Sequence, residues 1–375
     1  MFSIILYAVG SLLHFYVAGR LYAIRPLRER IGPRGWWIGA VVVWLVYLAG
    51  VRIGDEALDW RWWPGQFAVT WLGVLFVMAM CLLVVDLATG LGLWWRRHVS
   101  RLMAVAAVAG VLLGGFAIYQ AMRAPLVVEH EVVLEDLPAA LDGLVLVAVT
   151  DLHLGAQRGT GWLERRVGQV NALSPDAVVM VGDQVEGKPV GEARMAAVLR
   201  GIEAPLGVWA VTGNHEFHGD LQATLAEFEA GGVRWLRDAN ARIAPGLVLT
   251  GIDDIGRAMR RGGDYVGGLD RVLEARPQGA SILLSHTPAP GVIEHAARRG
   301  VDLMLSGHTH GGQVWPFGHL VKRVFPQLVG AHEVGGMTLV ISRGACSWGP
   351  RMRLWRRGEI LKLTLRAARP DRPPR

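Results

Sequence analysis

The chain is poor in cysteine and in charged residues for its length. Its 375 residues include only two cysteines, and since Cys81 lies within a long apolar run, we expect no disulfide between it and Cys346. Charged residues make up 19% of the chain and apolar residues 52%, whereas an ordinary soluble protein has about 25% charged residues. The scarcity of cysteine excludes a disulfide-stapled miniprotein, and the high apolar content excludes a disordered chain.

The net charge of +7 suggests nucleic-acid binding at first sight, but the charge is unevenly distributed. Residues 1–122 hold ten arginines and five acidic residues, whereas residues 123–375 hold 29 basic and 27 acidic residues. Most of the excess therefore lies in short loops between apolar stretches, where arginine sets the orientation of membrane helices. Because a nucleic-acid surface needs clustered basic residues on the soluble part, we predict no nucleic-acid partner.

Four apolar stretches in the first 122 residues are each long enough to cross a bilayer, which takes about 20 residues. Tryptophans gather near their ends, as at Trp62 and Trp63, in the manner of the aromatic belt at membrane interfaces. Asp86 lies about one bilayer length further on and is expected at the opposite interface. The first stretch lacks the basic start and cleavage site of a signal peptide, so we interpret it as a retained helix. We predict membrane helices at about residues 2–19, 36–52, 64–85 and 102–122.

After residue 122, short runs of valine, leucine and isoleucine alternate with helical stretches. Runs that are apolar throughout are typical of strands buried on both faces, and strand–helix alternation indicates a layered α/β core. About 250 residues are enough for one such domain. We therefore predict a transmembrane domain at residues 1–122, a second domain at residues 123–368 and a disordered tail at residues 369–375.

Polar side chains directly follow five of the predicted strands. In open α/β sheets, ligands bind beyond the carboxyl ends of the strands, so these side chains are expected to meet in one place. Two pairs are separated by one residue, and in an extended segment such side chains point the same way. The candidate residues are, in chain order, Asp151, His153, Asp183, Asn214, His215, His286, His308 and His310.

The mixture of carboxylate, imidazole and amide donors suits divalent Mn, Fe or Zn, and not a soft thiolate site. Two such ions about 3.5–4 Å apart can share a bridging carboxylate and hold a hydroxide for in-line attack on phosphorus. Any one motif alone is explained as well by loop polar residues or a hydrogen-bonded histidine. Five in order, each ending an apolar strand, indicate a two-metal centre.

The five blocks together resemble the calcineurin-like metallophosphoesterase superfamily, whose pattern is D-x-H, GDxx(D), GNH(D/E), H and GHxH. The resemblance covers roughly residues 127–365, and the stretches at residues 307–313 and 350–353 look like the bacterial membrane-associated branch, which includes lipid-related phosphoesterases. It implies that the membrane helices precede a four-layer α/β/β/α catalytic domain. It also implies metal-dependent hydrolysis of a phosphoester or phosphoanhydride.

The resemblance further implies a role for each candidate residue. His215 would protonate the leaving oxygen. The family often has aspartate where this chain has Glu186, so the role of Glu186 in orienting that histidine stays open. The implied ligands are Asp151, His153 and His310 for one ion, Asn214, His286 and His308 for the other, and Asp183 as the bridge.

A different class of function is the alternative: a non-catalytic membrane receptor or scaffold with a retired phosphatase domain. Retired copies usually lose a ligand, and all seven implied ligands are present here. Only residues 123–132 separate the last predicted span from the domain, so the site stays near the bilayer. The expected partners are therefore the membrane and a phosphorylated substrate, for which a lipid-like molecule is the hypothesis.

The arginines also predict the side of the membrane. The loops after the first and third spans carry eight arginines, whereas the loop between the second and third spans carries two arginines and three acidic residues. Short arginine-rich loops stay in the cytoplasm, which places the N-terminus and, after four crossings, the catalytic domain outside. We predict a multi-pass protein of a bacterial inner membrane with its catalytic domain on the periplasmic side.

Overall fold

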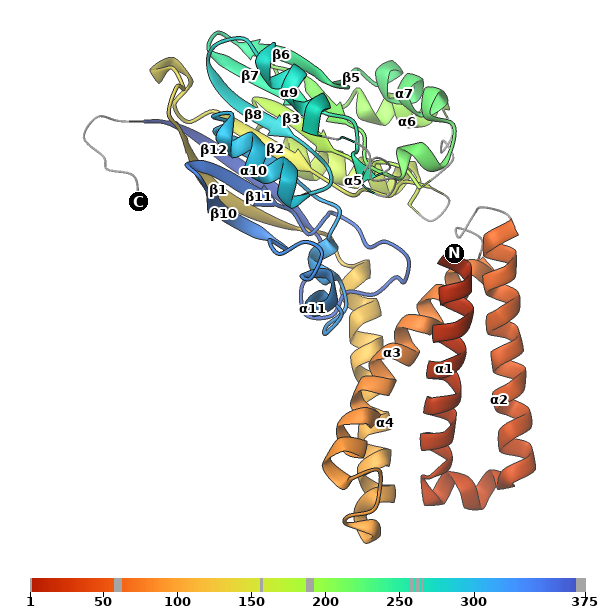
Figure 1. The fold of residues 1–375 in the computed structure, drawn as a ribbon. Helices are drawn as coiled ribbons and strands as arrows, with labels where there is room; N and C mark the ends of the chain where they lie inside the picture. Colours follow the sequence, from red (N-terminus) through yellow and green to blue (C-terminus); the bar gives the residue numbers. More distant parts are fainter. Residues whose placement is uncertain are drawn as a thin grey trace. The chain divides into compact units, whose positions relative to one another are not determined.

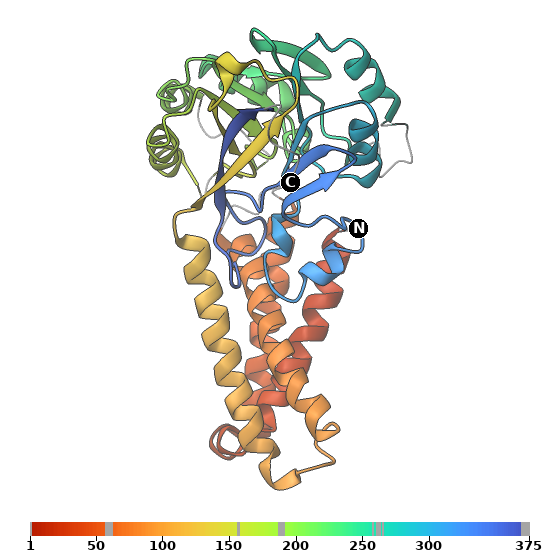
Figure 2. The ribbon, with the colours of Figure 1, turned by 90° about the vertical axis from the view of Figure 1, so that its left-hand side faces the viewer.

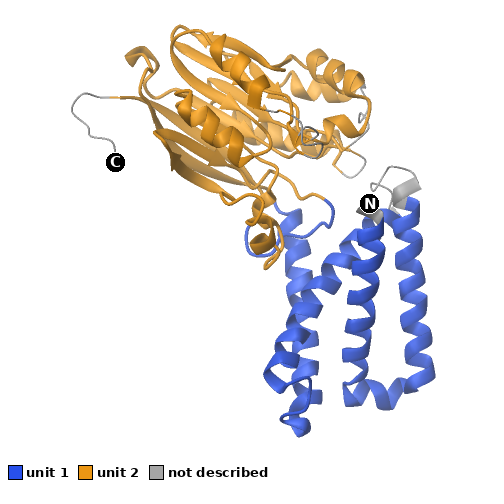
Figure 3. Ribbon diagram, in the orientation of Figure 1, with its two compact units in different colours: residues 1–123, 349–356 blue, residues 124–348, 357–375 orange. Residues whose placement is uncertain are grey.

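The structure, a computed structural model, describes residues 2–56, 63–155, 158–186, 192–256, 259, 264 and 266–368. The predicted disordered tail at residues 369–375 lies outside the described residues. Contacts within the chain divide it into two compact units (Figure 3). The helical unit holds residues 1–123 and Gly349–Arg356, and the two-sheet unit holds residues 124–348 and 357–375.

Four long helices form most of the helical unit, as the sequence predicts (Figure 1). Each contains a stretch of at least 19 residues that is apolar enough to cross a membrane. The second helix begins at Arg25, ahead of its predicted start, because it includes a short helical part before the apolar part. The two parts meet at a kink at Gly32 (φ 69°), and Pro33 is the first residue of the apolar part. The helices are α1 (Phe2–Tyr22), α2 (Arg25–Glu56), α3 (Trp63–Thr89) and α4 (Arg96–Met122).

The helices α3 and α4 approach each other closely at a glycine. A Cβ atom added to Gly110 in α4 would lie 2.9 Å from the Cα of Met78 in α3, too close for any side chain. Gly114, four residues on, faces Val74 of the same helix. This is the small-xxx-small spacing that lets the backbones of membrane helices come together. Gly110 therefore sets the separation of α3 and α4.

An ion pair between a partly exposed arginine and a buried aspartate links α1 to α3. The Asp86 side chain is fully buried, with its Oδ2 2.8 Å from Nε of Arg20 and accepting a 2.6 Å hydrogen bond from the Tyr16 hydroxyl. Asp86 is thus enclosed between helices and does not face solvent. Its two partners offset the free-energy cost of removing a carboxylate from water.

The segment Gly349–Arg356 lies within the span of the predicted second domain, but its contacts group it with the helices. Gln66 in the first turn of α3 donates a hydrogen bond of 3.0 Å to the carbonyl oxygen of Gly349. The backbone N–H of Arg353 donates one of 2.8 Å to the carbonyl oxygen of Ala117 in α4. The chain thus returns to the helices once after leaving α4.

The described residues of the two-sheet unit form twelve strands in two six-stranded sheets. The first sheet has the order β1-β12-β2-β3-β4-β5 and the second β10-β11-β9-β8-β7-β6. Within them, β2 to β5 are parallel to one another, and so are β7, β8, β9 and β11. The strands are β1 (Leu126–Leu134), β2 (Val145–Val149), β3 (Ala177–Val181), β4 (Val208–Val211), β5 (Val233–Trp235), β6 (Ala239–Ala244), β7 (Leu247–Gly251), β8 (Ala280–Leu284), β9 (Leu303–Ser306), β10 (Gly330–Val334), β11 (Met337–Ile341) and β12 (Glu359–Ala367).

The sheets stack face to face, and helices cover their outer faces, which confirms the predicted four layers (Figure 2). Alternate residues of a strand serve different cores: in β2, Leu146 belongs to the core between the sheets and Val147 to the core beneath the helices. Both faces are therefore apolar, which explains the unbroken apolar runs. The helices are α5 (Thr160–Asn171), α6 (Glu192–Leu199) and α7 (Leu221–Ala230) on the first sheet, α9 (Val266–Glu274) and α10 (Pro290–Arg298) on the second, and α11 (Gly318–Val321) in a loop; short 3₁₀ turns are η1 (Ala139–Leu141), η2 (Glu216–His218) and η3 (His310–Gly312).

We predict that Gly110→Val destabilises the helical unit, because the new side chain would push α4 away from Met78. Gly115→Val, on the same helix, is the matched control, since a Cβ on Gly115 would meet nothing within 4 Å. The melting temperature of the purified chain in detergent measures the difference. A lower value for Gly110→Val alone supports close packing, and equal values for the two variants contradict it.

Candidate metal centre

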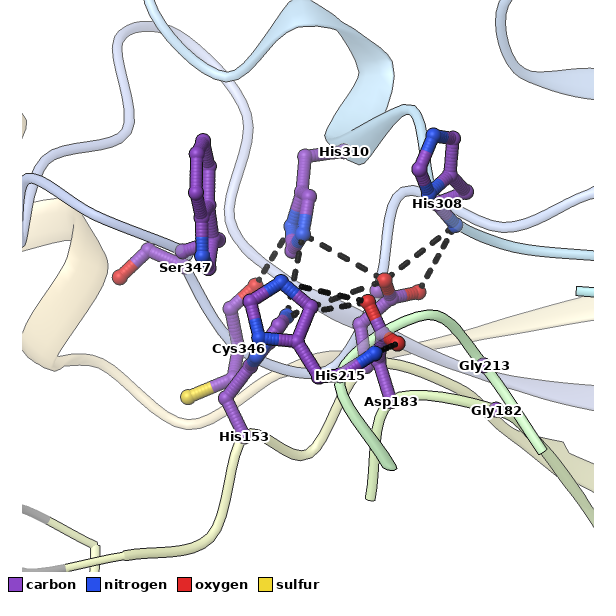
Figure 4. A network of polar contacts seen from close by, with 12 residues as sticks. His153, Gly182, Asp183, Gly213, His215, His308, His310, Cys346 and Ser347 are labelled. Atoms are coloured by element: carbon purple, nitrogen blue, oxygen red, sulfur yellow. Dashed lines mark hydrogen bonds and ion pairs between the residues drawn. The ribbon is translucent and has the colours of Figure 1, made fainter. Parts of the chain in front are cut away.

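The candidate residues converge where parallel strands of both sheets end (Figure 4). Asp151, Asp183 and Asn214 follow β2, β3 and β4 of the first sheet, while His286 and His308 follow β8 and β9 of the second. Contacts cross from sheet to sheet. The ring of His286 donates from Nδ1 to the carbonyl oxygen of Val181 at 2.9 Å, and the backbone N–H of His308 donates to the Asp151 carboxylate at 3.2 Å. The centre thus lies at the seam between the two sheets.

One group of donors surrounds Asp151. Nε2 of His310 lies 3.4 Å from Oδ1 of Asp151, and Nε2 of His153 lies 3.9 Å from the same oxygen. The two Nε2 atoms are 3.3 Å apart. All three side chains are buried, and their donor atoms lie within 4.8 Å of one another. This spacing is suited to a single ion held by one carboxylate and two imidazoles.

A second group surrounds Asp183. Its Oδ2 lies 3.1 Å from Nε2 of His286, and one donor atom of His308 lies within 4.8 Å of both side chains. The same Oδ2 is 3.9 Å from Nε2 of His153 in the first group. Asp183 is therefore within reach of both groups, the position that a bridging ligand requires.

Three of the histidines are held by their Nδ1 atoms, so that Nε2 faces the centre. Nδ1 of His153 is 2.7 Å from Glu186, Nδ1 of His286 is 2.9 Å from the Val181 carbonyl oxygen, and Nδ1 of His310 is 3.1 Å from the Cys346 carbonyl oxygen. An oxygen acceptor at Nδ1 fixes the tautomer in which Nε2 carries a free lone pair. This is the arrangement of histidines that bind metal ions.

Glu186 contacts two histidines: His215, for which the sequence left its role open, and His153, which the sequence did not predict. Besides His153, it reaches Nδ1 of His215, with Oε1 3.2 Å away. Burial alone would raise the pKa of Glu186, but the charges of His215 and His153 and their hydrogen bonds hold it below its usual value. The additional methylene relative to aspartate therefore still allows contact with both rings.

The carboxylates determine the charge of the centre. Burial alone would raise the pKa of Asp183, but the rings of His286 and His215 hold it well below its usual value. Burial lowers the pKa of an imidazole, yet Asp183 and Glu186 outweigh it and raise the pKa of His215 to about 9. Asp183 and Glu186 are thus kept ionised and His215 protonated at neutral pH.

Five candidate residues have left-handed backbone conformations, which the sequence did not predict. The two i, i+2 pairs do converge, but both members of each pair lie in left-handed turns, so the extended segment assumed from the sequence was wrong. A left-handed non-glycine residue costs about 1–2 kcal/mol, and such strain gathers at functional sites. The φ angles are 53° at Asp151, 46° at His153, 54° at Asp183, 68° at His308 and 49° at His310.

The motif glycines are required by close packing against the ligands. A Cβ on Gly182 would lie 2.5 Å from the His286 ring, and one on Gly213 would overlap the Asp183 carboxylate. Gly182 also has a φ of 76°, which only glycine adopts freely. The glycines before Asp183 and Asn214 therefore allow the two strand ends to close around the centre.

Glu216 organises the loops of the centre, and the sequence assigned it no role. Its fully buried carboxylate accepts hydrogen bonds from the backbone N–H groups of Asp183 (3.0 Å), Gln184 (2.7 Å), Val185 (3.2 Å) and Gly213 (2.5 Å). Four donors on one carboxylate hold the loops after β3 and β4 together. An acidic residue directly after the Gly-Asn-His motif was the available signal.

The residues present fit two divalent ions. Asn214 is buried, and no described residue hydrogen-bonds to its Oδ1. Such an oxygen costs free energy unless a ligand uses it. The donor set has two carboxylates, four imidazoles and one amide oxygen, which suits Mn, Fe or Zn. Among the described residues, neither donor group includes a cysteine sulfur.

Comparison with known proteins gives the family. A family model described as calcineurin-like phosphoesterase matches residues 144–312. A protein of Danio rerio named transmembrane protein with metallophosphoesterase domain is 31% identical over 326 residues, covering 82% of this chain and 74% of that protein. The chain therefore belongs to the calcineurin-like metallophosphoesterase family, as its motifs predict.

Two other proteins are similar to this chain to different degrees. An uncharacterized metallophosphoesterase of Campylobacter jejuni is 31% identical over 263 residues, which is 68% of each chain. The crystal structure of a dimetal phosphatase from Danio rerio has 13% identity and a TM-score of 0.36, covering 54% of this chain and 88% of that one.

We predict that Glu216→Gln lowers metal affinity by about 10–100-fold, the usual range for a residue that supports metal ligands. The amide would present an N–H₂ group to backbone N–H donors and loosen both loops. Glu229→Gln, at an exposed position of α7, is the control. Titration of the metal-free chain with Mn²⁺ or Zn²⁺ gives the affinity. Unchanged affinity in Glu216→Gln would show that the loops hold without it.

Proposed function

We propose that the chain is a metal-dependent enzyme that hydrolyses a phosphoester or phosphoanhydride at the centre between the two sheets. The observation that carries the proposal is the shared position of Asp183, 3.1 Å from Nε2 of His286 and 3.9 Å from Nε2 of His153. A carboxylate between two donor groups fits a bridge between two divalent ions.

The remaining donors would divide between the ions. Ions held in this way supply an activated water and neutralise charge on the phosphoryl oxygens. Backbone N–H groups hold the two carboxylates in place, since His308 donates to Asp151 and His215 donates to Asp183 at 2.9 Å. The proposed ligands are Asp151, His153 and His310 for one ion, and Asn214, His286 and His308 for the other.

His215 would act as the general acid. Its Nε2 lies 3.9 Å from Oδ2 of Asp183, beside the donor groups but outside the proposed ligand set. Glu186 contacts its Nδ1, which orients the ring and favours the protonated state. His215 can then donate the Nε2 proton to the leaving oxygen, which lowers the barrier to cleaving the P–O bond.

A membrane-bound, amphiphilic substrate is the proposed class. α4 ends at Met122 and β1 begins at Leu126, so three residues join the last apolar helix to the first strand. An extended chain spans at most about 3.6 Å per residue, which limits this connection to roughly 14 Å across the four residue steps. A two-sheet unit joined to an apolar helix by so short a connection is suited to a phosphorylated lipid or a nucleotide-linked lipid.

The proposed location is a bacterial inner membrane, with the catalytic unit in the periplasm. Four apolar helices and relatives named transmembrane proteins support membrane insertion. The proposed orientation follows from eight arginines at the C-terminal end of α1 and in the N-terminal parts of α2 and α4, beside the α1–α2 and α3–α4 connections.

We predict that Asp183→Asn abolishes hydrolysis of bis(p-nitrophenyl) phosphate and lowers the metal content, since the amide loses the charge that two ions share. Asp270→Asn is the control, because Asp270 pairs with His295 and Arg299 on the outer helices. Turnover and elemental analysis are measured on the same preparations. Wild-type turnover with full metal content in Asp183→Asn would disprove the two-metal proposal.

We predict that His215→Ala keeps its metal but loses rate, most strongly for substrates with poor leaving groups. A leaving group with a high pKa depends more on protonation, so the loss should rise with that pKa. His218→Ala, whose ring lies 4.8 Å from that of His215, is the control. Rates for a series of aryl phosphodiesters give the dependence. An equal loss for all leaving groups would argue against a general acid.

We predict that alkaline phosphatase fused after residue 375 is active in a bacterial host. Green fluorescent protein at the same position should be dark when the fusion is exported through the general secretory route. The pair reports on which side the C-terminus lies. An inactive alkaline phosphatase together with a bright fluorescent protein would show the reverse topology and leave the proposed chemistry unchanged.

A further inference from the structure

A loop beside the metal centre exposes an unusual number of large apolar side chains. Seven such side chains are exposed among the described residues of the two-sheet unit, and four of them lie within residues 315–324. A soluble domain rarely displays contiguous apolar groups of this size without a partner. The seven are Leu126, Val133, Trp315, Phe317, Leu320, Val324 and Trp348.

The loop, residues 313–325, is internally ordered, so its apolar side chains are held outward. The N–H of Phe317 donates to the Val314 carbonyl oxygen at 2.9 Å, and Gly318 packs against Gly312 at the base. α11 then displays Leu320, which is 53% exposed. These contacts use the backbone of the loop, and its large apolar side chains are exposed.

Both ends of the loop contact proposed metal ligands. The loop follows η3, which contains His310, and the ring of Phe325 lies 5.4 Å from the ring of His308. A molecule bound at the centre by its phosphate would therefore have the loop beside it.

Hydrogen bonds connect the start of the loop to Trp348, another exposed tryptophan of the two-sheet unit. Gln313 donates to the carbonyl oxygen of Trp348 at 2.9 Å and accepts from its N–H at 3.0 Å.

The charge of the loop selects the kind of surface it fits. Lys322 and Arg323 follow α11 and are both exposed, and the described residues 313–325 contain no acidic residue. Tryptophan and leucine next to lysine and arginine are typical of segments that lie in the headgroup region of an anionic bilayer.

We propose that residues 315–324 insert into the interface of the bilayer and form a lipid-facing entrance to the metal centre. The proposal rests on the proposed function only in that the bound molecule would be an amphiphile, with its phosphate at the ions and its apolar part along the loop. The occupant of the surface is anionic phospholipid.

The test places a photoreactive benzoylphenylalanine at Leu320 in the full chain, reconstituted in vesicles of phosphatidylcholine and fluorescent phosphatidylglycerol. Val133 is the matched control site, because it is 55% exposed and lies on β1, outside residues 315–324. We expect at least fivefold more covalently attached fluorescent lipid at position 320 than at position 133. Replacing Lys322 and Arg323 by glutamate should lower the attachment to phosphatidylglycerol.

Equal attachment at the two positions would overturn the proposal, and so would attachment unaffected by the charge reversal. Size-exclusion profiles in detergent verify that each variant is folded. Hydrolysis of bis(p-nitrophenyl) phosphate, measured in parallel, reports on the proposed function separately. Turnover without lipid attachment would contradict the lipid-facing loop alone, and lipid attachment without turnover would contradict the phosphoesterase alone.

Discussion

The structure of the centre depends on two carboxylates buried between the sheets. Removing a carboxylate from water costs several kcal/mol, so Asp151 and Asp183 are tolerable there only with compensating charge and hydrogen bonds. Backbone N–H groups from other strand ends supply part of that compensation, and the imidazoles supply further compensation. The left-handed turns and the close-packed glycines also contribute to this compensation, because they bring the N–H groups and imidazoles close to the buried carboxylate oxygens.

The sequence predicted much of this centre because its signals are local. Asp151 and Asp183 each follow an apolar strand within two residues, and parallel strands carry such residues to one edge of a sheet. The α/β class was also predictable, since strands with apolar residues on both faces need cover on each side, whereas the four layers came from the family resemblance. The family motifs then assigned roles to the histidines.

What the sequence did not predict depends on distant contacts. In the sequence, Glu216 is an ordinary acidic loop residue. Its role depends on the fold, which places four backbone N–H groups from two loops around its carboxylate. The contact of Glu186 with both rings depends on His153 lying beside His215, although these two histidines are far apart in the chain. Left-handed φ angles at aspartate and histidine have no composition signal, unlike those at glycine. The contacts of Gly349–Arg356 with the helices could not be predicted, because that segment is neither apolar nor long.

The central claim is that two ions share Asp183 among nitrogen and oxygen donors. X-ray absorption spectroscopy of the metal-loaded chain tests it most directly, because it reports the distances from each ion to its neighbours. The account predicts a first shell of nitrogen and oxygen atoms and metal–metal scattering at about 3.5–4 Å. A single ion without metal–metal scattering, or a sulfur atom in the first shell from the nearby Cys346, would contradict it.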